Sequence, residues 1–326
     1  MTARTARALA LAFGSALGCL ACGPPAAEPL PPNSLAFGVF GDGPYYPWER
    51  GRYRRLLEDV GATDIEWLLH VGDLFWYPCS DEEYALRASE LAAVPHPVVY
   101  TPGDNEWADC HKLRAGRHDP LDRLAALRRA FFSDPTHSTG TPKLALETQA
   151  ADSAFAEFGE NARWRRGGFV FATVHLVGSH NGMKPFEGRT TASDVEGERR
   201  MRAGLAWLEQ TMDTARATGA NGAVIAFHAE IGLDPEYVDA RAGYERITAR
   251  LQHEAATFPG QIILIHGDSH HARVDHPLRD WNGRPYERFT RIETFGSPDI
   301  GWLRVVLDTV AGRVVRVETR KLRGWW

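Results

Sequence analysis

The chain has 326 residues, of which 44% are hydrophobic and 24% are charged, and its formal net charge is −5. This length and hydrophobic content suffice for one large domain with a substantial core. An acidic protein is a poor partner for nucleic acid, so we expect no nucleic-acid ligand. After residue 22, no run approaches the roughly eighteen apolar residues that a membrane span needs.

The N-terminus has the pattern of an export signal. Arg4 and Arg7 precede an apolar stretch at 8–21, which is short for a membrane span. The segment Ser15-Ala16-Leu17-Gly18-Cys19 resembles a bacterial lipoprotein cleavage site, in which Cys19 becomes the lipidated first residue. Secretory cleavage near Cys22 and an uncleaved anchor are the alternatives.

Three segments follow from this interpretation. We expect residues 1–18 to be a signal peptide, residues 19–34 a Pro/Ala-rich tether, and residues 35–326 the folded domain. The predicted location is the cell envelope or periplasm, with contact to the membrane only through a lipid on Cys19; a secreted protein is the alternative. Without the two arginines of the signal segment, the formal charge of −5 becomes −7.

The rest of the chain alternates strand patterns with helix patterns. Runs at 35–40, 67–71, 98–101, 168–176, 223–227, 262–265, 288–295, 301–308 and 314–320 predict strands. Helices are predicted at 49–60, at 119–132 with Asp119 as N-cap and Pro120 in the first turn, and around 201–212. This alternation, with some strands in hairpins, favours two sheets flanked by helices over a single parallel sheet.

Four of these strands stop at the dipeptide Gly-Asp. The dipeptides are Gly41-Asp42, Gly72-Asp73, Gly103-Asp104 and Gly267-Asp268. The strand at 223–227 ends in His228, and the last Gly-Asp continues to Ser269-His270. A lone Asp after a strand is most often a helix cap or a turn residue. Five strand ends carrying Asp or His at the edge where ligands collect instead predict a shared metal site.

These residues resemble the motifs of the calcineurin-like metallophosphoesterases. That family reads Asp-x-His, Gly-Asp, Gly-Asn-His-Glu, a lone His after a strand, and Gly-His-x-His. The strings Pro102-Gly103-Asp104-Asn105-Glu106-Trp107, His266-Gly267-Asp268-Ser269-His270 and Thr294-Phe295-Gly296-Ser297-Pro298 look like those of a bacterial branch. The resemblance covers residues 35 to about 308. It implies a four-layer α/β/β/α sandwich of two mixed sheets and an exported, monomeric phosphoesterase for small phosphate monoesters or diesters.

The resemblance also implies a ligand set for two metal ions. Asp73 would bridge them; Asp42 and His270 would complete the first site, and Asp104, His228 and Asp268 the second. Water between the ions would attack the phosphoryl group. No Gly-x-Ser-x-Gly or His-Glu-x-x-His motif offers a competing mechanism.

Three departures from the family pattern affect this set. Pro44 stands where the first motif has His, so Tyr45, Tyr46 or water is a candidate to fill the place. Asp104-Asn105 replaces Asn-His, and a one-residue slip in register would make Asn105 the ligand. Asp268 also replaces a His. Because these changes favour oxygen ligands, we expect Mn²⁺, Mg²⁺ or an iron ion rather than Zn²⁺.

Two residues are candidates for the leaving-group end of the reaction. Asn105 occupies the position of the family's general acid, and an amide cannot donate a proton in that way. His180, in a Gly-flanked turn after the strand at 168–176, either supplies the proton or only shapes the turn.

Cys79 and Cys110 each follow a site aspartate, Asp73 and Asp104 respectively, by six residues. In an exported protein, two cysteines in neighbouring loops predict a disulfide, with two small buried apolar residues as the alternative.

Two other functional classes stay open. The first is a catalytically weak metal-binding envelope protein on the same fold, with a ligand-binding or interaction role. The second is a carboxylate-rich exported fold in which the aspartates are only caps and turns. Bound metal would exclude the class in which the aspartates are only caps and turns. Turnover of a phosphodiester would distinguish the enzyme from the catalytically weak metal-binding protein.

Overall fold

The first sheet is built around three parallel strands that each lead into a Gly-Asp motif. These are β1 (Ser34–Phe40), β2 (Leu68–His70) and β3 (Pro97–Tyr100). Antiparallel strands β12 (Gly301–Asp308), β13 (Arg313–Lys321) and β4 (Thr139–Gly140) complete the order β13-β12-β1-β2-β3-β4.

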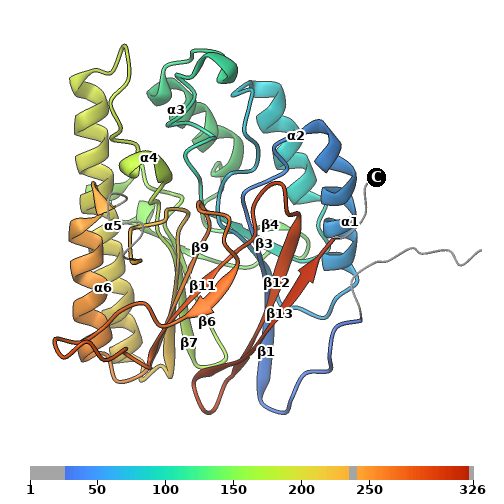
Figure 1. Cartoon of the computed structure of the whole chain (residues 1–326), viewed down its shortest axis with the longest axis vertical. Helices are drawn as coiled ribbons and strands as arrows, with labels where there is room; N and C mark the ends of the chain where they lie inside the picture. The colour runs from blue at the N-terminus through green and yellow to red at the C-terminus, as the bar shows by residue number, and fades with distance from the viewer. Residues whose placement is uncertain (1–25, 235–240, 323–326) are drawn as a thin grey trace, which may run out of the picture.

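The computed structural model describes residues 26–234 and 241–322 (Figure 1). The expected signal segment with Cys19 and Cys22 lies outside them.

The second sheet has a parallel centre with antiparallel edges. Its parallel strands are β7 (Phe169–Thr173), β8 (Gly222–Ala226), β9 (Gln261–His266) and β11 (Phe289–Glu293). Its edge strands are β5 (Glu147–Thr148), β6 (Ala162–Arg166) and β10 (Arg273–Asp275), in the order β10-β11-β9-β8-β7-β6-β5. Both sheets are therefore mixed.

The alternation of side chains along each strand explains the sandwich. In β1, Leu35, Phe37 and Val39 face the second sheet, whereas Ala36 and Phe40 face the helices. Between the sheets, the Phe37 ring stacks on Trp67 with centroids 5.3 Å apart and meets Phe171 of β7 edge-on. The inner core thus joins strands that are distant in sequence.

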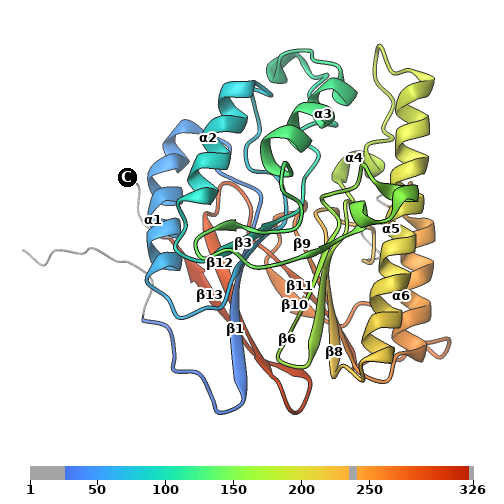
Figure 2. The same ribbon diagram turned by 180° about the vertical axis from the view of Figure 1, so that it is seen from behind.

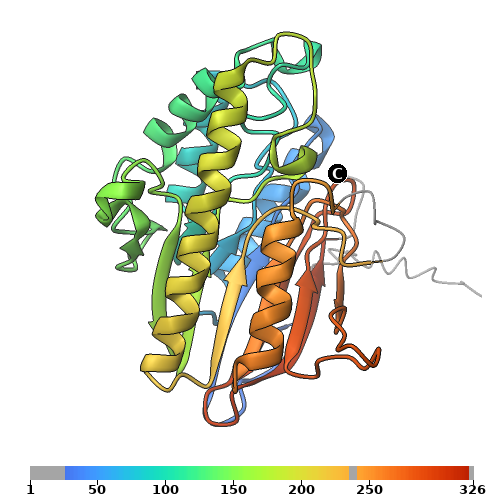
Figure 3. The same cartoon turned by 90° about the vertical axis from the view of Figure 1, so that its left-hand side faces the viewer.

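Helices cover both outer faces. Helices α1 (Arg50–Gly61), α2 (Asp81–Ala92) and α3 (Pro120–Phe131) pack on the first sheet, and α5 (Thr191–Ala217) and α6 (Glu245–Thr257) on the second. Seen from behind, the two helix layers lie on opposite sides (Figure 2), and α5 and α6 run side by side (Figure 3). The predicted four-layer α/β/β/α class is confirmed.

Local signals account for helix α3. The Asp119 side chain accepts a hydrogen bond from the Leu121 amide at 2.8 Å, and Pro120 occupies the first turn. Helix α1 begins at Arg50, one residue later than predicted, because Pro47–Glu49 first form a 3-10 turn. Strand β7 ends at Thr173, earlier than the predicted 176.

Part of the expected tether lies on the domain. The Glu28 carbonyl accepts a hydrogen bond from Arg304 at 2.8 Å, and Leu30 packs on the core under the first helix layer. The folded domain therefore includes contacts from residue 28 onward. Within the described ranges, no helix combines the length and apolar character that crossing a membrane requires.

Candidate metal centre

The turns after the parallel strands meet at one edge of the sandwich. The Asp42 amide donates to the Gly72 carbonyl at 3.0 Å, and the Gly43 amide donates to the Asp73 carbonyl at 2.8 Å. The Asp268 amide, from the turn after β9, donates to Oδ1 of Asp42 at 3.0 Å. Backbone bonds thus fix the predicted carboxylates relative to one another.

His228 lies at the middle of these carboxylates. Its Nε2 atom is 3.2 Å from Asp104 Oδ1, 3.4 Å from Asp73 Oδ1 and 3.7 Å from Asp268 Oδ1. Its Nδ1 atom lies 2.9 Å from the carbonyl of Val71. With the Nδ1 proton donated to that carbonyl, the neutral form of the ring would present the Nε2 lone pair to the cluster.

His270 has the same arrangement at the more exposed side. Its Nδ1 atom is 2.8 Å from the Ser297 carbonyl, and its Nε2 atom is 3.6 Å from Asp42 Oδ1. Both rings therefore turn a nitrogen toward buried carboxylates, and a neutral imidazole held by a carbonyl is a common metal ligand. This donor set fits divalent cations.

The ligand atoms fall into two overlapping groups. Asp42, Asp73 and His228 form one, and Asp104, His228 and Asp268 form the other, with ligand atoms within 4.8 Å of one another in each group. The residue common to both groups is His228, whereas the sequence predicted Asp73 as the bridge. The structure brings all the predicted ligands to one place; which atoms bind an ion stays a prediction.

Tyr45 lies near Asp42, where the first family motif has a His that this chain replaces by Pro44. Its hydroxyl donates to Asp73 Oδ2 at 2.5 Å and lies 3.4 Å from Nε2 of His270. Of the three candidates considered for that place, Tyr45 is the one whose side chain contacts two predicted ligands. Burial, followed by the charge of Asp73, raises the pKa of the phenol well above its usual value.

Asp104 and Asn105 have different roles in the cluster. Asp104 faces His228, while the Asn105 side-chain amide donates to Asp73 Oδ2 at 2.5 Å. The Asn105 backbone amide also donates to Asp73 Oδ1, at 3.1 Å. Asn105 therefore acts as a double hydrogen-bond donor to Asp73.

His180 lies beside the centre, in the turn α4 (Gly178–Asn181), where its φ is 55°. An added Cβ on Gly178 would come within 2.9 Å of both Asp268 and Asp104, so this turn contacts the second group. Within the described ranges, no hydrogen bond or ion pair joins the His180 imidazole to the carboxylates. Its role as proton donor stays a prediction.

Strained backbone is concentrated at the centre. Asp42, Asp73, Asp268 and His270 have φ of 56°, 57°, 73° and 64°. Residues other than glycine rarely adopt this left-handed conformation, and it persists where the surroundings impose it, often at functional sites. Here it turns four predicted ligands inward at the ends of strands.

The glycines of the motifs leave room for the carboxylates. A Cβ on Gly103 would lie 2.1 Å from Asp73 Oδ1, and one on Gly267 would lie 2.1 Å from Asp42 Oδ2. Both contacts are far shorter than van der Waals distance. In these two motifs, the Gly thus makes space for the Asp of another motif.

The electrostatics of the cluster favour a positive ion. Burial, with repulsion from Asp268, raises the pKa of Asp42 to about 8, and burial with repulsion from Asp104 raises that of Asp268 to about 7. Burial lowers the pKa of His228, but the Asp73 charge and the hydrogen bond to Asp104 outweigh it and raise that pKa well above the usual value. Bound cations would relieve this repulsion.

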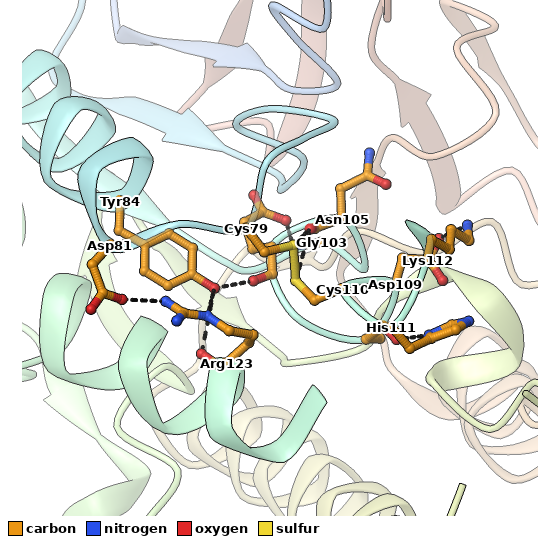
Figure 4. The surroundings of a disulfide bond; sticks show 12 residues. Cys79, Asp81, Tyr84, Gly103, Asn105, Asp109, Cys110, His111, Lys112 and Arg123 are labelled. Carbon is orange, nitrogen blue, oxygen red and sulfur yellow. Dashed lines mark hydrogen bonds and ion pairs between the residues drawn. A yellow bond between two sulfur atoms is a disulfide. The ribbon is translucent and has the colours of Figure 1, made fainter. Parts of the chain in front are cut away.

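The predicted disulfide is confirmed. Cys79 and Cys110 are bonded to each other beside Asn105 (Figure 4). Their sulfur atoms lie 3.3 and 3.6 Å from the Asn105 carbonyl oxygen. The bond therefore joins the loops after β2 and β3 next to Asp73 and Asp104.

Two buried glutamates that the sequence analysis did not single out hold the loops in position. Glu106 accepts hydrogen bonds from the Leu74 amide at 2.6 Å and the Gly103 amide at 3.1 Å. Glu49 accepts from the Ser297 hydroxyl at 2.7 Å and from the Tyr45 amide at 2.8 Å. Glu106 belongs to the motif Gly103-Asp104-Asn105-Glu106, so its place in the motif could have indicated a role at the site. Nothing in the sequence around Glu49 indicated its role.

A third acidic group lies behind the turn after β9. It contains Glu230, His266 and Glu293. Arg273 lies 2.7 Å from Glu293 and 3.3 Å from Glu230, so its guanidinium already offsets their charge. This group is better explained as an ion-pair network than as a metal site.

No family model matches the chain, and no curated protein matches its sequence. Among solved structures, it is similar to the protein TT1561 of Thermus thermophilus, with 12% identity, a TM-score of 0.46, and 89% of this chain and 99% of that chain covered. It is similar to a Staphylococcus aureus protein assigned as a 5′-nucleotidase, solved with α-ketoglutarate, with 14% identity, a TM-score of 0.46, and coverage of 89% and 54%. A 5′-nucleotidase from Candida albicans follows, with 11% identity, a TM-score of 0.40, and coverage of 86% and 49%. The chain spans about half the length of the latter two, and likenesses this distant assign no reaction to it.

Proposed function

We propose that this protein is an exported two-metal phosphoesterase that hydrolyses phosphate monoesters or diesters by attack of water. The motif resemblance to calcineurin-like metallophosphoesterases supports this proposal. The Cys79–Cys110 disulfide supports export, because disulfides persist in oxidising compartments. Anchoring through a lipid on Cys19 is part of the proposal.

One observation carries it. Four aspartates from separate Gly-Asp turns surround His228, and the Nε2 atoms of His228 and His270 face these carboxylates. A set of turns that served only as caps would direct its carboxylates to backbone amides of its own helices. Here three carboxylates lie within 3.7 Å of one imidazole nitrogen.

Residues of the centre would hold the metal ions and orient Asp73 for hydrolysis of a phosphate ester. Asp42, Asp73, Asp104, Asp268, His228 and His270 would hold two cations, with Mn²⁺, Mg²⁺ or iron preferred because the donors are mostly oxygen. Two such cations would supply an activated water and offset the charge on the phosphoryl oxygens. Tyr45 and Asn105 fix the orientation of Asp73 through hydrogen bonds to its Oδ2 atom.

Metal analysis combined with a phosphate-ester assay tests the proposal. Purified protein should contain two metal ions per chain and hydrolyse bis(4-nitrophenyl) phosphate or 4-nitrophenyl phosphate, and chelation should abolish both properties. Asp213, an exposed aspartate on α5, offers a matched control for aspartate substitutions. Protein without bound metal, or with metal-independent turnover, would overturn the proposal.

A specific observation favours a second candidate function. Asn105 donates its amide to Asp73 in the position where a general acid is expected, and a protein that lost catalysis could keep its metal ions. The alternative is a catalytically weak, metal-binding envelope protein with a ligand-binding or interaction role. Two bound ions without turnover of any tested ester would support it.

A further inference from the structure

A row of aromatic side chains leads outward from the metal centre. Tyr45, which contacts Asp73, has its ring centroid 6.1 Å from that of Trp76. Trp76 meets the Tyr46 ring edge-on at 5.5 Å, and Tyr46 stacks on Trp48 at 4.4 Å with an interplanar angle of 9°. These four side chains, the aromatic row, come from the loops after β1 and β2.

The aromatic row is accessible to a ligand. Tyr45, Tyr46 and Trp76 are partly exposed, and Trp48 leaves 66% of its surface exposed. Burying aromatic surface is favourable in free energy, so the aromatic row beside a charged centre points to an apolar group on the ligand. Aromatic rings offer stacking and edge-to-face contacts that aliphatic groups cannot match.

A second, independent observation concerns the leaving group. The motif resemblance gives the position of Asn105 to a general acid, but its side-chain amide donates to Asp73, and an amide supplies no proton to a departing oxygen. An alkoxide departs poorly without a proton, whereas a phenolate departs without one because its charge spreads into the ring. The chemistry of the centre and the aromatic row therefore favour the same kind of ester.

We propose that the aromatic row is a subsite for the leaving group and that the substrates are aryl phosphate esters. This inference rests on the proposed function. Water attacks phosphorus, the bond between phosphorus and the aryl oxygen breaks, and the phenolate leaves with that electron pair and takes a proton from solvent. Trp76 and Tyr46, next to Tyr45, contact a ring attached directly to the phosphoryl oxygen. Trp48, one ring further out, contacts a larger aromatic group.

Binding of stable analogues to the metal-loaded protein tests the subsite without turnover. Phenylphosphonate should bind more tightly than methylphosphonate by roughly three- to tenfold, the range expected for one added aromatic contact. Trp76→Leu should remove this preference, and Trp48→Ala should reduce the additional affinity for naphthylphosphonate. Trp281→Ala is the control, because Trp281 is 92% exposed and lies in the loop between β10 and β11.

Turnover then separates the subsite from the proposed function. Phenyl phosphate should have a higher kcat/KM than the phosphate ester of a fluorinated alcohol that is about as acidic as phenol. Trp48→Ala changes an exposed position, so this variant should retain the fold. Equal kcat/KM for the two esters overturns the subsite but leaves the phosphoesterase intact. Selective phenylphosphonate binding without turnover defeats the phosphoesterase and keeps the aromatic subsite. Faster hydrolysis of 5′-nucleotides than of phenyl phosphate overturns the proposed substrate class.

Discussion

The hydroxyl of Tyr45 lies 2.5 Å from Oδ2 of Asp73, the same oxygen that accepts the side-chain amide of Asn105. Two donors from separate loops thus orient one carboxylate. Asp73 Oδ1 in turn faces His228. Asp73 therefore contacts Tyr45, Asn105 and His228 at once.

The first prediction follows from these contacts. Asp73→Ala should abolish binding of both metal ions and lower activity by more than the roughly 100-fold that loss of an outer partner costs. Asp42→Ala should chiefly empty the first site. Elemental analysis of the purified variants measures this, with Asp213→Ala as control. Two ions per chain in Asp73→Ala would disprove the bridging role.

The second prediction concerns the space beside the carboxylates. Gly103→Ala should displace Asp73, because the new methyl group would lie 2.1 Å from its Oδ1 atom. We expect loss of metal and a fall of about 1–3 kcal/mol in the free energy of unfolding, as for other overpacked sites. Gly219→Ala is the control: nothing lies within 4 Å of the added carbon, but φ is 61°, so it should lower stability through the backbone alone and leave metal affinity unchanged. Metal titration and denaturant unfolding report the two effects, and normal metal affinity in Gly103→Ala contradicts the prediction.

The third prediction concerns the Cys79–Cys110 bond. It closes a 31-residue separation, so replacing both residues by serine should lower the free energy of unfolding by roughly 2–4 kcal/mol. Because the bond adjoins Asn105, metal affinity should fall as well. Urea unfolding with and without metal measures both. Unchanged metal affinity in a destabilised variant would limit the bond to a structural role.

The fourth prediction concerns the missing general acid. With Asn105 in place, rates should depend steeply on the acidity of the leaving group, and nitrophenyl esters should far exceed alkyl phosphates. Asn105→His should improve alkyl substrates by up to the 10²–10⁴-fold typical of general acids. If His180 supplies the proton instead, His180→Ala should harm alkyl esters selectively. A shallow dependence that survives His180→Ala points to an acid not yet identified.

The fifth prediction is a pH dependence of the metal-free protein. The pKa values of Asp42 and Asp268, about 8 and about 7, exceed their ordinary value of 3.8. Above about pH 6.5 the histidines of the unfolded chain are mostly neutral. Between about pH 6.5 and pH 8 the two carboxyls therefore make the folded chain bind more protons than the unfolded chain, and its stability should fall as pH rises. Below this range the lowered pKa values of His70, His175 and His270 act in the opposite direction. Thermal melts in chelator across this range measure the slope.

Metal should reverse this trend, because binding requires deprotonated carboxylates and a neutral imidazole, and its stabilisation therefore grows with pH. Asp42→Asn should flatten the metal-free slope. A metal-free stability that rises from pH 6.5 to pH 8 contradicts the raised pKa values of the two carboxyls.

The sequence by itself was enough to predict the layers, the Gly-Asp turns after the strands and the disulfide. The short apolar run at 35–40, bounded by Gly41, specifies a strand buried on both faces. Asp119-Pro120 specifies where α3 begins, and both signals are local in the chain. Carboxyl ends of parallel strands share one sheet edge, so Gly-Asp at those ends was enough to predict that the aspartates converge.

Only the tertiary structure decided which atoms face one another. Glu49 and Ser297 are 248 residues apart, and their hydrogen bond fixes the loop that carries Tyr45. The direction of the Asn105 amide, the shared position of His228 and the aromatic row depend likewise on how separate loops meet. Local patterns set the conformation of each segment, whereas these contacts follow from packing two sheets whose strands are distant in sequence.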